Sequence, residues 1–439
     1  MSAQQRTYAE PPVEPGQRSG LPRLLAGVSG HGVMSLEHHR VVHGTAPLAR
    51  GRRAHKIDLI EQVELAGLRG RGGGGFPAAM KMRAVAASRG RPVVLVNAAE
   101  GEPASRKDRT LTRALPHLVL DGAELAAQAI GARELIVGVC ESAQASIESL
   151  EVAIAERGAQ PREAARTRVV NVPNRYVAGQ ETALVNLVGG GPALPTFTPP
   201  MPFERGVGGR PTLIANAETL AHMALIARYG GRWFRELGTL ADPGSALVTL
   251  SGAVARAGVY EIALGESLAS VIDAAGGLTA RPAAVLLGGY SGAWVSAEHL
   301  HELSLADEQL APYGASLGAG VVFVLSEHAC PVAELARLAG WLAAQSARQC
   351  GPCVHGLDAI ATSLQEVAGG VVHSNVRERI ESLAALVRGR GACAHPDGTA
   401  RMVLSALDTF AVELSDHAKH GPCDRCGRPP ELPLGAPAR

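Results

Sequence analysis

The chain has 439 residues, 46% of them hydrophobic, which is enough to fill the cores of roughly three domains and argues against large-scale disorder. Its 42 basic and 41 acidic side chains nearly cancel, so neither a nucleic acid nor an anionic membrane surface is favoured as a partner. The sequence shows no signal-peptide pattern and no run of about 18 apolar residues. We therefore expect a cytoplasmic protein, peripheral to the inner face of the membrane where a partner ties it there.

The first part of the chain divides into an arm and an α/β domain. Residues 1–50 are rich in Pro, Gly, Arg and His without sustained periodicity, so we predict a flexible or partner-docked arm. In residues 51–240, apolar runs at 92–97 and 134–140 predict buried parallel strands, with a helical segment at 118–130 between them. Alternating strands and helices predict an α/β layer domain.

The second part of the chain has a different predicted order of strands and helices. Residues 245–328 contain two strands, a helix and further strands, which is typical of a β-grasp-like module. Residues 330–420 predict a four-helix bundle, and 421–439 form a tail that carries a Cys-x-x-Cys motif and ends in an expected disordered stretch. The four helices are expected at 332–347, 357–367, 376–388 and 400–417.

A glycine cluster occupies residues 70–75. Gly70 and Gly72 satisfy the dinucleotide pattern G-x-G-x-x-G, but a six-residue run with five glycines does so nearly by chance, and a helix rather than a strand precedes it. Glycines allow backbone N–H groups to approach an anion or a flat ring, and a helix beginning near Pro77 offers its positive end. The cluster alone is therefore compatible with an anion site or with an ordinary flexible loop.

Four segments in fixed order carry more information: residues 67–81, 97–103 with Lys107-Asp108-Arg109, 176–184, and 209–219. Together they resemble the flavin-site motifs of the NADH-oxidising subunit of respiratory complex I, and of its relatives in NAD-linked hydrogenases and formate dehydrogenases. The resemblance covers roughly residues 55–415. It implies an α/β FMN-binding domain with a glycine-rich loop, a β-grasp-like (SLBB-type) module and a C-terminal four-helix iron–sulfur bundle, with FMN as cofactor and NADH as donor.

The resemblance also implies residue roles. Glu102 and Glu181 are expected to position the nicotinamide against the flavin, without acting as acid or base, and Phe76 to stack on NADH. The expected contacts of the cofactor and nucleotide are Gly70, Gly72, Phe76, Lys81, Asn97, Glu100, Tyr176, Gly179, Asn216 and Thr219. The alternatives are a helix start for Asn216 and Thr219, a surface charge for Lys81 and solvated acids for the two glutamates.

The chain departs from the family pattern on both sides of the expected flavin. Ala99 and Gln180 replace an aspartate and a glutamate, and the loss of two negative charges should raise the flavin potential. Ala84, Thr198 and Met201 replace presumed NADH contacts, so we expect weak binding of NADH. A donor other than NADH, or a scaffold subunit that has lost its cofactors, is the competing hypothesis.

Five of the seven cysteines lie within residues 350–426, which favours metal ligation over a disulfide framework. By resemblance, Cys350, Cys353 and Cys393 ligate a 4Fe–4S or 3Fe–4S cluster, and Ala347 stands where the family has a further cysteine. The expected substitutes for the missing ligand are His355, His395, Cys423 and Cys426.

Zinc is the alternative metal, held by the two Cys-x-x-Cys pairs, Cys350 with Cys353 and Cys423 with Cys426. Cys140 and Cys330 are expected to be buried hydrophobic residues. Electrons would leave through the cluster to a small iron–sulfur protein, either ferredoxin-like or a thioredoxin-like 2Fe–2S protein, and a membrane redox subunit is the second expected partner.

Overall fold

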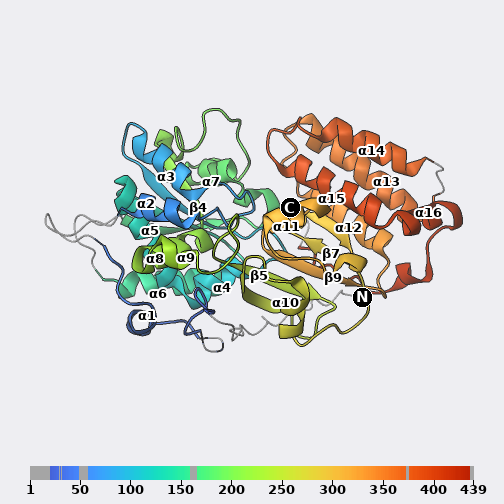
Figure 1. Ribbon diagram of the computed structural model, residues 1–439. Helices are drawn as coiled ribbons and strands as arrows, with labels where there is room; N and C mark the ends of the chain where they lie inside the picture. Colours follow the sequence, from blue (N-terminus) through green and yellow to red (C-terminus); the bar gives the residue numbers. More distant parts are fainter. Residues whose placement is uncertain are drawn as a thin grey trace.

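The computed structural model describes residues 20–28, 30, 32–48, 58–158, 166–371 and 375–435. Figure 1 shows an α/β part in blue and green beside a yellow-to-orange β module, with orange-to-red helices at the C-terminal end. Within the described residues, no helix combines the length and the apolar character needed to cross a bilayer.

The first sheet has four parallel strands in the order β3-β2-β1-β4. They are β1 (Val93–Ala98), β2 (Glu134–Cys140), β3 (Arg166–Val172) and β4 (Thr212–Asn216). Strand β1 is almost wholly apolar because helices cover both of its faces. The strand order reverses between β1 and β4, and such a switch point leaves a crevice at the carboxyl ends of the strands.

Helices surround this sheet. The most extensive helix–helix contact in this part joins α5 to α8, which lie side by side over β1. The helices are α2 (Leu59–Ala66), α3 (Ala78–Ala87), α4 (Lys107–Ala114), α5 (Pro116–Ile130), α6 (Gln144–Glu156), α7 (Glu181–Val188), α8 (Ala217–Tyr229) and α9 (Gly231–Phe234).

The second sheet has five strands in the order β6-β5-β9-β7-β8, with β5 and β9 parallel and the other pairs antiparallel. Alternate residues of β9 serve two cores: Phe323 packs with the C-terminal helices, and its neighbours Val322 and Val324 pack around α10. The elements are β5 (Ser245–Gly252), β6 (Gly258–Ala263), α10 (Leu268–Ala274), β7 (Pro282–Leu287), β8 (Ala293–Ser296), α11 (Asp307–Leu310) and β9 (Val321–Ser326).

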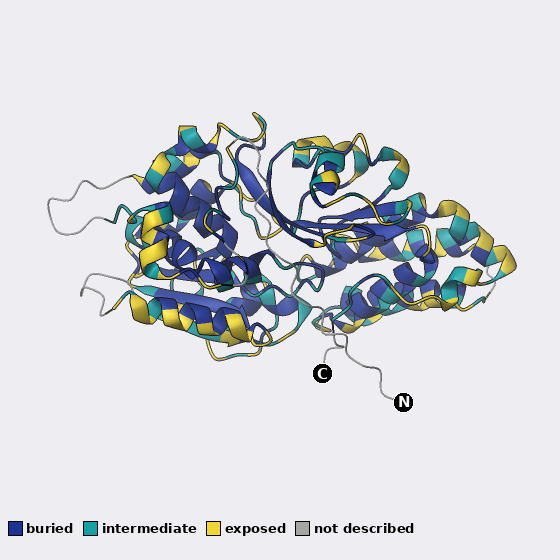
Figure 2. Cartoon of the chain, turned by 90° about the horizontal axis from the view of Figure 1, so that it is seen from below, coloured by how far each residue is buried: buried dark blue, intermediate teal, exposed yellow. Residues whose placement is uncertain are grey.

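The C-terminal helices are α12 (Pro331–Ala344), α13 (Asp358–Ala368), α14 (Val376–Val387), α15 (His395–Thr409) and α16 (Ala411–His420). Figure 2 shows their buried faces turned inward and their exposed faces outward. The helix expected at 400–417 is in fact broken at Phe410, which leaves the helical conformation with φ −110° and ψ 29°. Phe410 packs edge-on against Trp294, with ring centroids 5.2 Å apart. Apolar periodicity continues through the break, so the sequence pattern does not reveal it.

The segment expected to be a flexible arm is packed on the chain where it is described. Leu24 and Leu25 are fully buried, and their backbone N–H groups donate to the Glu261 carboxylate at 2.9 and 3.0 Å. Helix α1 (Leu36–His43) follows, and His39 Nε2 lies 2.8 Å from Asp121 Oδ2 on α5. Burial of these apolar side chains and pairing of these polar groups stabilise the segment, although its sequence lacks helical or strand periodicity. Residues 1–19 and 49–57 lie outside the described residues.

The tail is also more ordered than expected. Leu432 is buried, and the Ser326 N–H at the end of β9 donates to Glu431 Oε2 at 3.0 Å. Trp341 Nε1 on α12 donates to the Gly435 carbonyl at 2.9 Å. Residues 429–435 therefore lie along the β module and the bundle, held by hydrogen bonds in both directions, while residues 436–439 lie outside the described residues.

Candidate functional site

The carboxyl ends of β1 and β4 bring two asparagines together. Asn97 and Asn216 are register partners on the two strands, and Asn216 Nδ2 donates to the Asn97 carbonyl at 3.4 Å. Asn216 also caps α8, since its Oδ1 accepts from the Glu218 N–H at 3.0 Å. The positive end of a buried helix therefore lies at the switch point of the sheet.

The glycine cluster lies directly over this edge. Residues 72–74 are exposed, and a Cβ on Gly72 would come within 3.4 Å of the Asn216 Cβ. The Arg71 N–H donates to Thr219 Oγ1 at 2.9 Å, which fastens the loop to the first turn of α8. Gly70 closes the other side of the loop, because its N–H donates to the Phe76 carbonyl at 2.9 Å. Exposed glycine backbone beside a helix N-terminus is a ready binding site for an anion.

A buried charge network holds Asn216 in place. Lys107 Nζ donates to Asn216 Oδ1 at 3.3 Å and to Glu218 Oε2 at 2.9 Å, and Asn216 Nδ2 donates to Asp108 Oδ2 at 2.7 Å. Desolvation opposes the charge on Lys107, but Asp108 and Glu218 raise the pKa of its ammonium above the usual value. No role was expected for Lys107, Asp108 or Glu218, although Lys107 and Asp108 adjoin the motif of residues 97–103 and Glu218 lies between Asn216 and Thr219.

A second polar group lies at the same edge. Lys81 on α3 pairs with Glu181, the first residue of α7, and its Nζ also donates to the Ile214 carbonyl of β4 at 3.3 Å. Asn97 Nδ2 donates to the Gly179 carbonyl at 2.8 Å, and a Cβ on Gly179 would come within 2.5 Å of the Ala99 carbonyl oxygen. The structure therefore brings Lys81, Asn97, Gly179 and Glu181 together, with Glu181 partly exposed.

Two residues of these motifs have structural roles here. Gln180 caps α7, because its Oε1 accepts from the Thr182 and Ala183 N–H groups at 2.8 and 3.0 Å. Glu100 is buried, and its carboxylate accepts from the Asp108 and Arg109 N–H groups at 3.2 and 3.3 Å. Its two oxygens therefore accept hydrogen bonds from the first turn of α4. The motif alone does not indicate this role.

Glu102 and Tyr176 lie where the α/β part meets the β module and the bundle. Glu102 Oε2 accepts from the Tyr290 N–H at 2.9 Å and from the Tyr176 hydroxyl at 3.3 Å. Its Oε1 is buried with no hydrogen-bond partner among the described residues, and burial raises the pKa of Glu102 to about 7. The Tyr176 ring packs edge-on against Trp341 at 5.4 Å. The hydrogen bonds of Glu102 thus run toward the second sheet, whereas Glu181 pairs with Lys81.

The residues expected on the nucleotide side are accessible. Phe76 is 49% exposed on the glycine loop, and Met201 lies in an exposed stretch with Thr198. A planar ligand therefore has an aromatic ring to stack on beside the glycine loop.

The three cysteines expected to ligate iron gather at one end of the bundle. Cys353 lies in the π-helical turn Pro352–Leu357, and its N–H donates to the Cys350 carbonyl at 3.1 Å. Burial, together with the nearby Cys350 and Cys393 thiols, raises the pKa of the Cys353 thiol to about 12. Although desolvation opposes it, the pKa of the neighbouring Cys350 thiol is lowered instead, because the Ala392 and Cys353 N–H groups and the Cys353 thiol donate to its sulfur. A cationic metal centre would remove the protons of all three thiols. Arg348, next to Ala347, has a left-handed φ of 53°.

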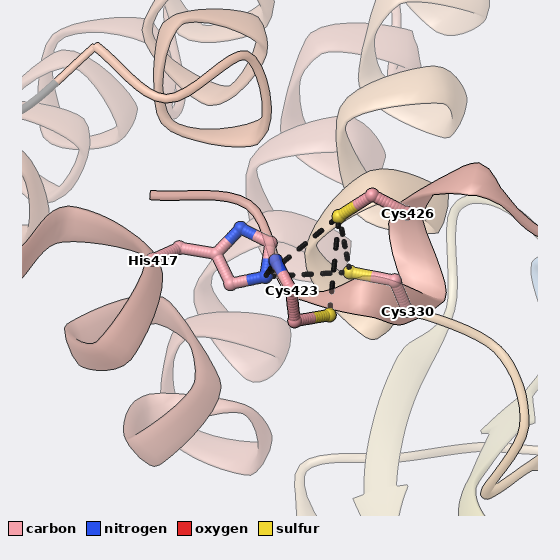
Figure 3. Close-up of side chains that lie close together, drawn as sticks. All are labelled: Cys330, His417, Cys423 and Cys426. Atoms are coloured by element: carbon pink, nitrogen blue, oxygen red, sulfur yellow. Dashed lines mark hydrogen bonds between the residues drawn. The ribbon is translucent and has the colours of Figure 1, made fainter. Parts of the chain in front are cut away.

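The other two tail cysteines do not complete that group. Cys423 and Cys426 gather instead with Cys330 and His417, all four ligand atoms lying within 4.8 Å of one another (Figure 3). The expected zinc site that combines these two cysteines with Cys350 and Cys353 is therefore wrong. Cys330 is buried as expected, but it also lies against three other ligand-type side chains. The chain returns past Cys330 after α16, a path that the spacing of the motifs does not reveal.

His395 stands two residues after Cys393, and its Nε2 is engaged by the backbone of α12. Its Nε2 lies 2.9 Å from the Leu342 carbonyl, and its ring contacts Tyr176 with centroids 5.5 Å apart. Its Nδ1 is buried and has no hydrogen-bond partner among the described residues, so His395 stays a candidate for the ligand that Ala347 does not supply.

Three family models match the chain in the order of its parts. Residues 63–225 match the Nuo51 FMN-binding domain, residues 247–290 the SLBB domain, and residues 333–417 the NADH-ubiquinone oxidoreductase-F iron–sulfur binding region. These matches confirm the expected succession of an FMN-binding α/β domain, an SLBB module and an iron–sulfur region.

Whole-chain comparisons agree. The second NADH-quinone oxidoreductase F subunit of Rhizobium meliloti is 33% identical over 378 residues, covering 83% of this chain and 90% of that protein. The corresponding F subunit of Streptomyces coelicolor is 31% identical over 397 residues, covering 87% and 88%. A crystal structure of an NAD+-reducing NiFe hydrogenase in the H2-reduced state superposes with a TM-score of 0.77 at 33% identity, over 82% of this chain. This chain spans 62% of the hydrogenase chain.

Proposed function

Because the chain belongs to the family of NADH-quinone oxidoreductase F subunits, we propose that it is a flavoprotein oxidoreductase of the NADH-dehydrogenase type. It takes electrons from NADH at FMN and passes them through an iron–sulfur cluster to a redox partner. The observation that carries this proposal is the pairing of Asn97 and Asn216 at the switch point, beneath an exposed glycine loop. FMN, when bound, supplies a two-electron acceptor for hydride that also releases electrons singly.

The residues at the sheet edge fit FMN. The exposed backbone of residues 72–74 and the N-terminus of α8 offer donors to an anionic phosphate. The amides of Asn97 and Asn216 offer polar contacts for the ring and the ribityl chain, and Lys81 adds a positive charge. Gly70, Gly72, Lys81, Asn97, Asn216 and Thr219 are therefore our proposed flavin residues.

The donor lies on the exposed side of this edge. Phe76 offers a ring for the nucleotide, and Glu181, held by Lys81, offers a carboxylate to its polar groups. Hydride transfer requires no proton removal by the protein, so Glu181 orients the donor and does not act as a base. Glu102 and Tyr176 lie between this edge and the bundle, and their role is to fix the geometry of that junction.

Electrons leave toward the bundle. Cys350, Cys353 and Cys393 would offer three thiolates to a cluster, and Ala347 would offer none. The partner we propose is a small iron–sulfur protein, in an assembly that also contains a membrane redox subunit. The names of the relatives, subunits of quinone oxidoreductases, support such an assembly.

The test is a direct assay of the full chain purified without oxygen. We expect about one FMN and one cluster per chain, and flavin reduction by NADH in stopped-flow measurements. Asn216→Ala should lose flavin, and Asn375→Ala, at an exposed asparagine that precedes α14 in the bundle, should keep it. Protein that binds no FMN after reconstitution contradicts the proposal. Protein that binds FMN but is not reduced by millimolar NADH has a different donor.

A further inference from the structure

Four ligand-type side chains converge where the β module joins the bundle (Figure 3). Cys330 immediately precedes α12, and His417 lies in the last turn of α16. Cys423 immediately precedes the turn Asp424–Gly427 and Cys426 lies within it, in a Cys-x-x-Cys spacing that is typical of zinc knuckles. Segments separated by 87 residues therefore meet at one point.

The distances between these atoms match a single tetrahedral ion. Zinc binds thiolate sulfur at about 2.3 Å and imidazole nitrogen at about 2.0 Å, so the edges of its tetrahedron are about 3.5–3.8 Å. The sulfur of Cys426 lies 3.9 Å from that of Cys423 and 3.4 Å from that of Cys330. His417 Nε2 lies 3.5 Å from the Cys330 sulfur and 3.9 Å from the Cys426 sulfur.

The surroundings favour an ion over a simple packing contact. The His417 side chain is buried, and its Nδ1 has no hydrogen-bond partner among the described residues. The Ala333 N–H at the start of α12 donates to the Cys330 sulfur at 3.4 Å, and a helix N-terminus stabilises a thiolate. Three sulfurs and one imidazole form a soft ligand set that selects zinc over magnesium or calcium.

This group is distinct from the iron–sulfur region. The family model for that region matches residues 333–417, so Cys330, Cys423 and Cys426 lie outside the match. Its sulfurs are spaced for one ion, whereas the bridging sulfides of a multi-iron cluster hold its thiolates farther apart. The four residues are therefore not substitutes for the ligand that Ala347 lacks.

We propose that Cys330, His417, Cys423 and Cys426 bind one structural Zn²⁺ that fastens the C-terminal segment to the junction of the β module and the bundle. All four positions are filled by protein, so no position is open for substrate. The C-terminal segment is bound across the junction: Arg425 NH1, between the two tail cysteines, donates to the Glu327 carbonyl at 3.1 Å, and the Glu431 N–H beyond them donates to Glu334 Oε1 at 2.9 Å. The ion anchors the start of this segment.

Metal analysis of the full chain, purified anaerobically and desalted after incubation with a weak chelator, tests the site. We expect one zinc per chain in addition to the iron. Cys426→Ser should lower zinc by more than about tenfold and leave iron and FMN unchanged, whereas Cys350→Ser should lower iron and leave zinc. Cys140→Ala, a buried cysteine in β2, is the matched control and should change neither metal.

X-ray absorption at the zinc edge of the unaltered protein gives a second test that does not depend on the folding of a variant. Three sulfur ligands at about 2.3 Å and one nitrogen at about 2.0 Å are expected. Zinc that survives Cys426→Ser, or that is lost with Cys350→Ser, overturns the proposal. So does iron in place of zinc at this site, or a count of alkylated thiols showing a disulfide among Cys330, Cys423 and Cys426. Flavin and iron contents report separately on the proposed function.

Discussion

At the carboxyl edge of the parallel sheet the buried charged side chains pair with one another, whereas in the bundle the Cys353 thiol lies buried near two other thiols. Lys107 binds Asn216 and Glu218, so the edge is fixed before any cofactor arrives. The Cys350 and Cys393 thiols instead raise the pKa of Cys353, an arrangement that an added metal would relieve. The difference indicates that the edge contributes to folding stability by itself, while the thiol groups contribute it through their metals.

The largest expected effect is at the cluster. Cys350→Ser should reduce bound iron and sulfide to nearly nothing, since only two of the proposed thiolates remain. The stability of the metal-free protein should hardly change, because no internal contact of comparable strength is lost. Iron analysis and urea unfolding of the metal-free protein measure the two quantities. A variant that retains its iron would break the comparison.

The sheet edge should respond in the opposite way. Lys107→Met removes the ammonium that pairs directly with the buried Asp108 and Glu218 carboxylates, so the cofactor-free protein should lose about 3–5 kcal/mol of unfolding free energy. Lys419→Met, at an exposed position on α16, is the control and should stay within about 0.5 kcal/mol. Equal stability of the two variants would show that the edge is not preorganised by this network.

Glu102 tests the junction between the two regions through pH. Its pKa of about 7 in the folded protein exceeds the usual value of 4.5, so the unfolded chain releases its proton first as pH rises. The stability contributed by the protonated form is complete below pH 4.5 and is lost as pH rises through 7, up to about 3 kcal/mol. Glu102→Gln should abolish this loss in urea unfolding at pH 5 and pH 8, whereas Glu148→Gln, at an exposed position, should preserve it.

The smallest expected effect is on the KM for NADH, because the Phe76 ring is exposed on the proposed donor side of the sheet edge. Phe76→Ala should raise the KM for NADH roughly fivefold, equivalent to about 1 kcal/mol, with FMN content and kcat unchanged. Phe76→Tyr retains the ring and should retain the KM. An unchanged KM in the alanine variant would place the nucleotide elsewhere.

The sequence predicted the parts of the structure that depend on local pattern. Apolar runs located β1 and β2, and the ordered motifs placed Asn97, Asn216 and Lys81 in segments that do meet at one edge. Such residues are predictable because strand direction and helix caps fix where their side chains point.

What the sequence did not reveal depends on long-range packing. The two Cys-x-x-Cys motifs are alike in spacing, yet Cys426 faces Cys330 because α15 and α16 turn at Phe410 and return the chain to the start of α12. Glu100 carries the same carboxylate as Glu181 but caps α4. The residues next to Cys426 and Glu100 in the sequence do not reveal either of these contacts.

The pairing of β1 with β4 has a consequence for folding kinetics. Asn97 and Asn216 are 119 residues apart in the chain, so their contact closes a long loop and forms only when most of the α/β part is in place. We therefore expect this edge of the sheet, and with it the proposed flavin site, to form late in folding. FMN present during refolding should therefore raise the final yield of native protein by mass action and leave the rate of folding unchanged.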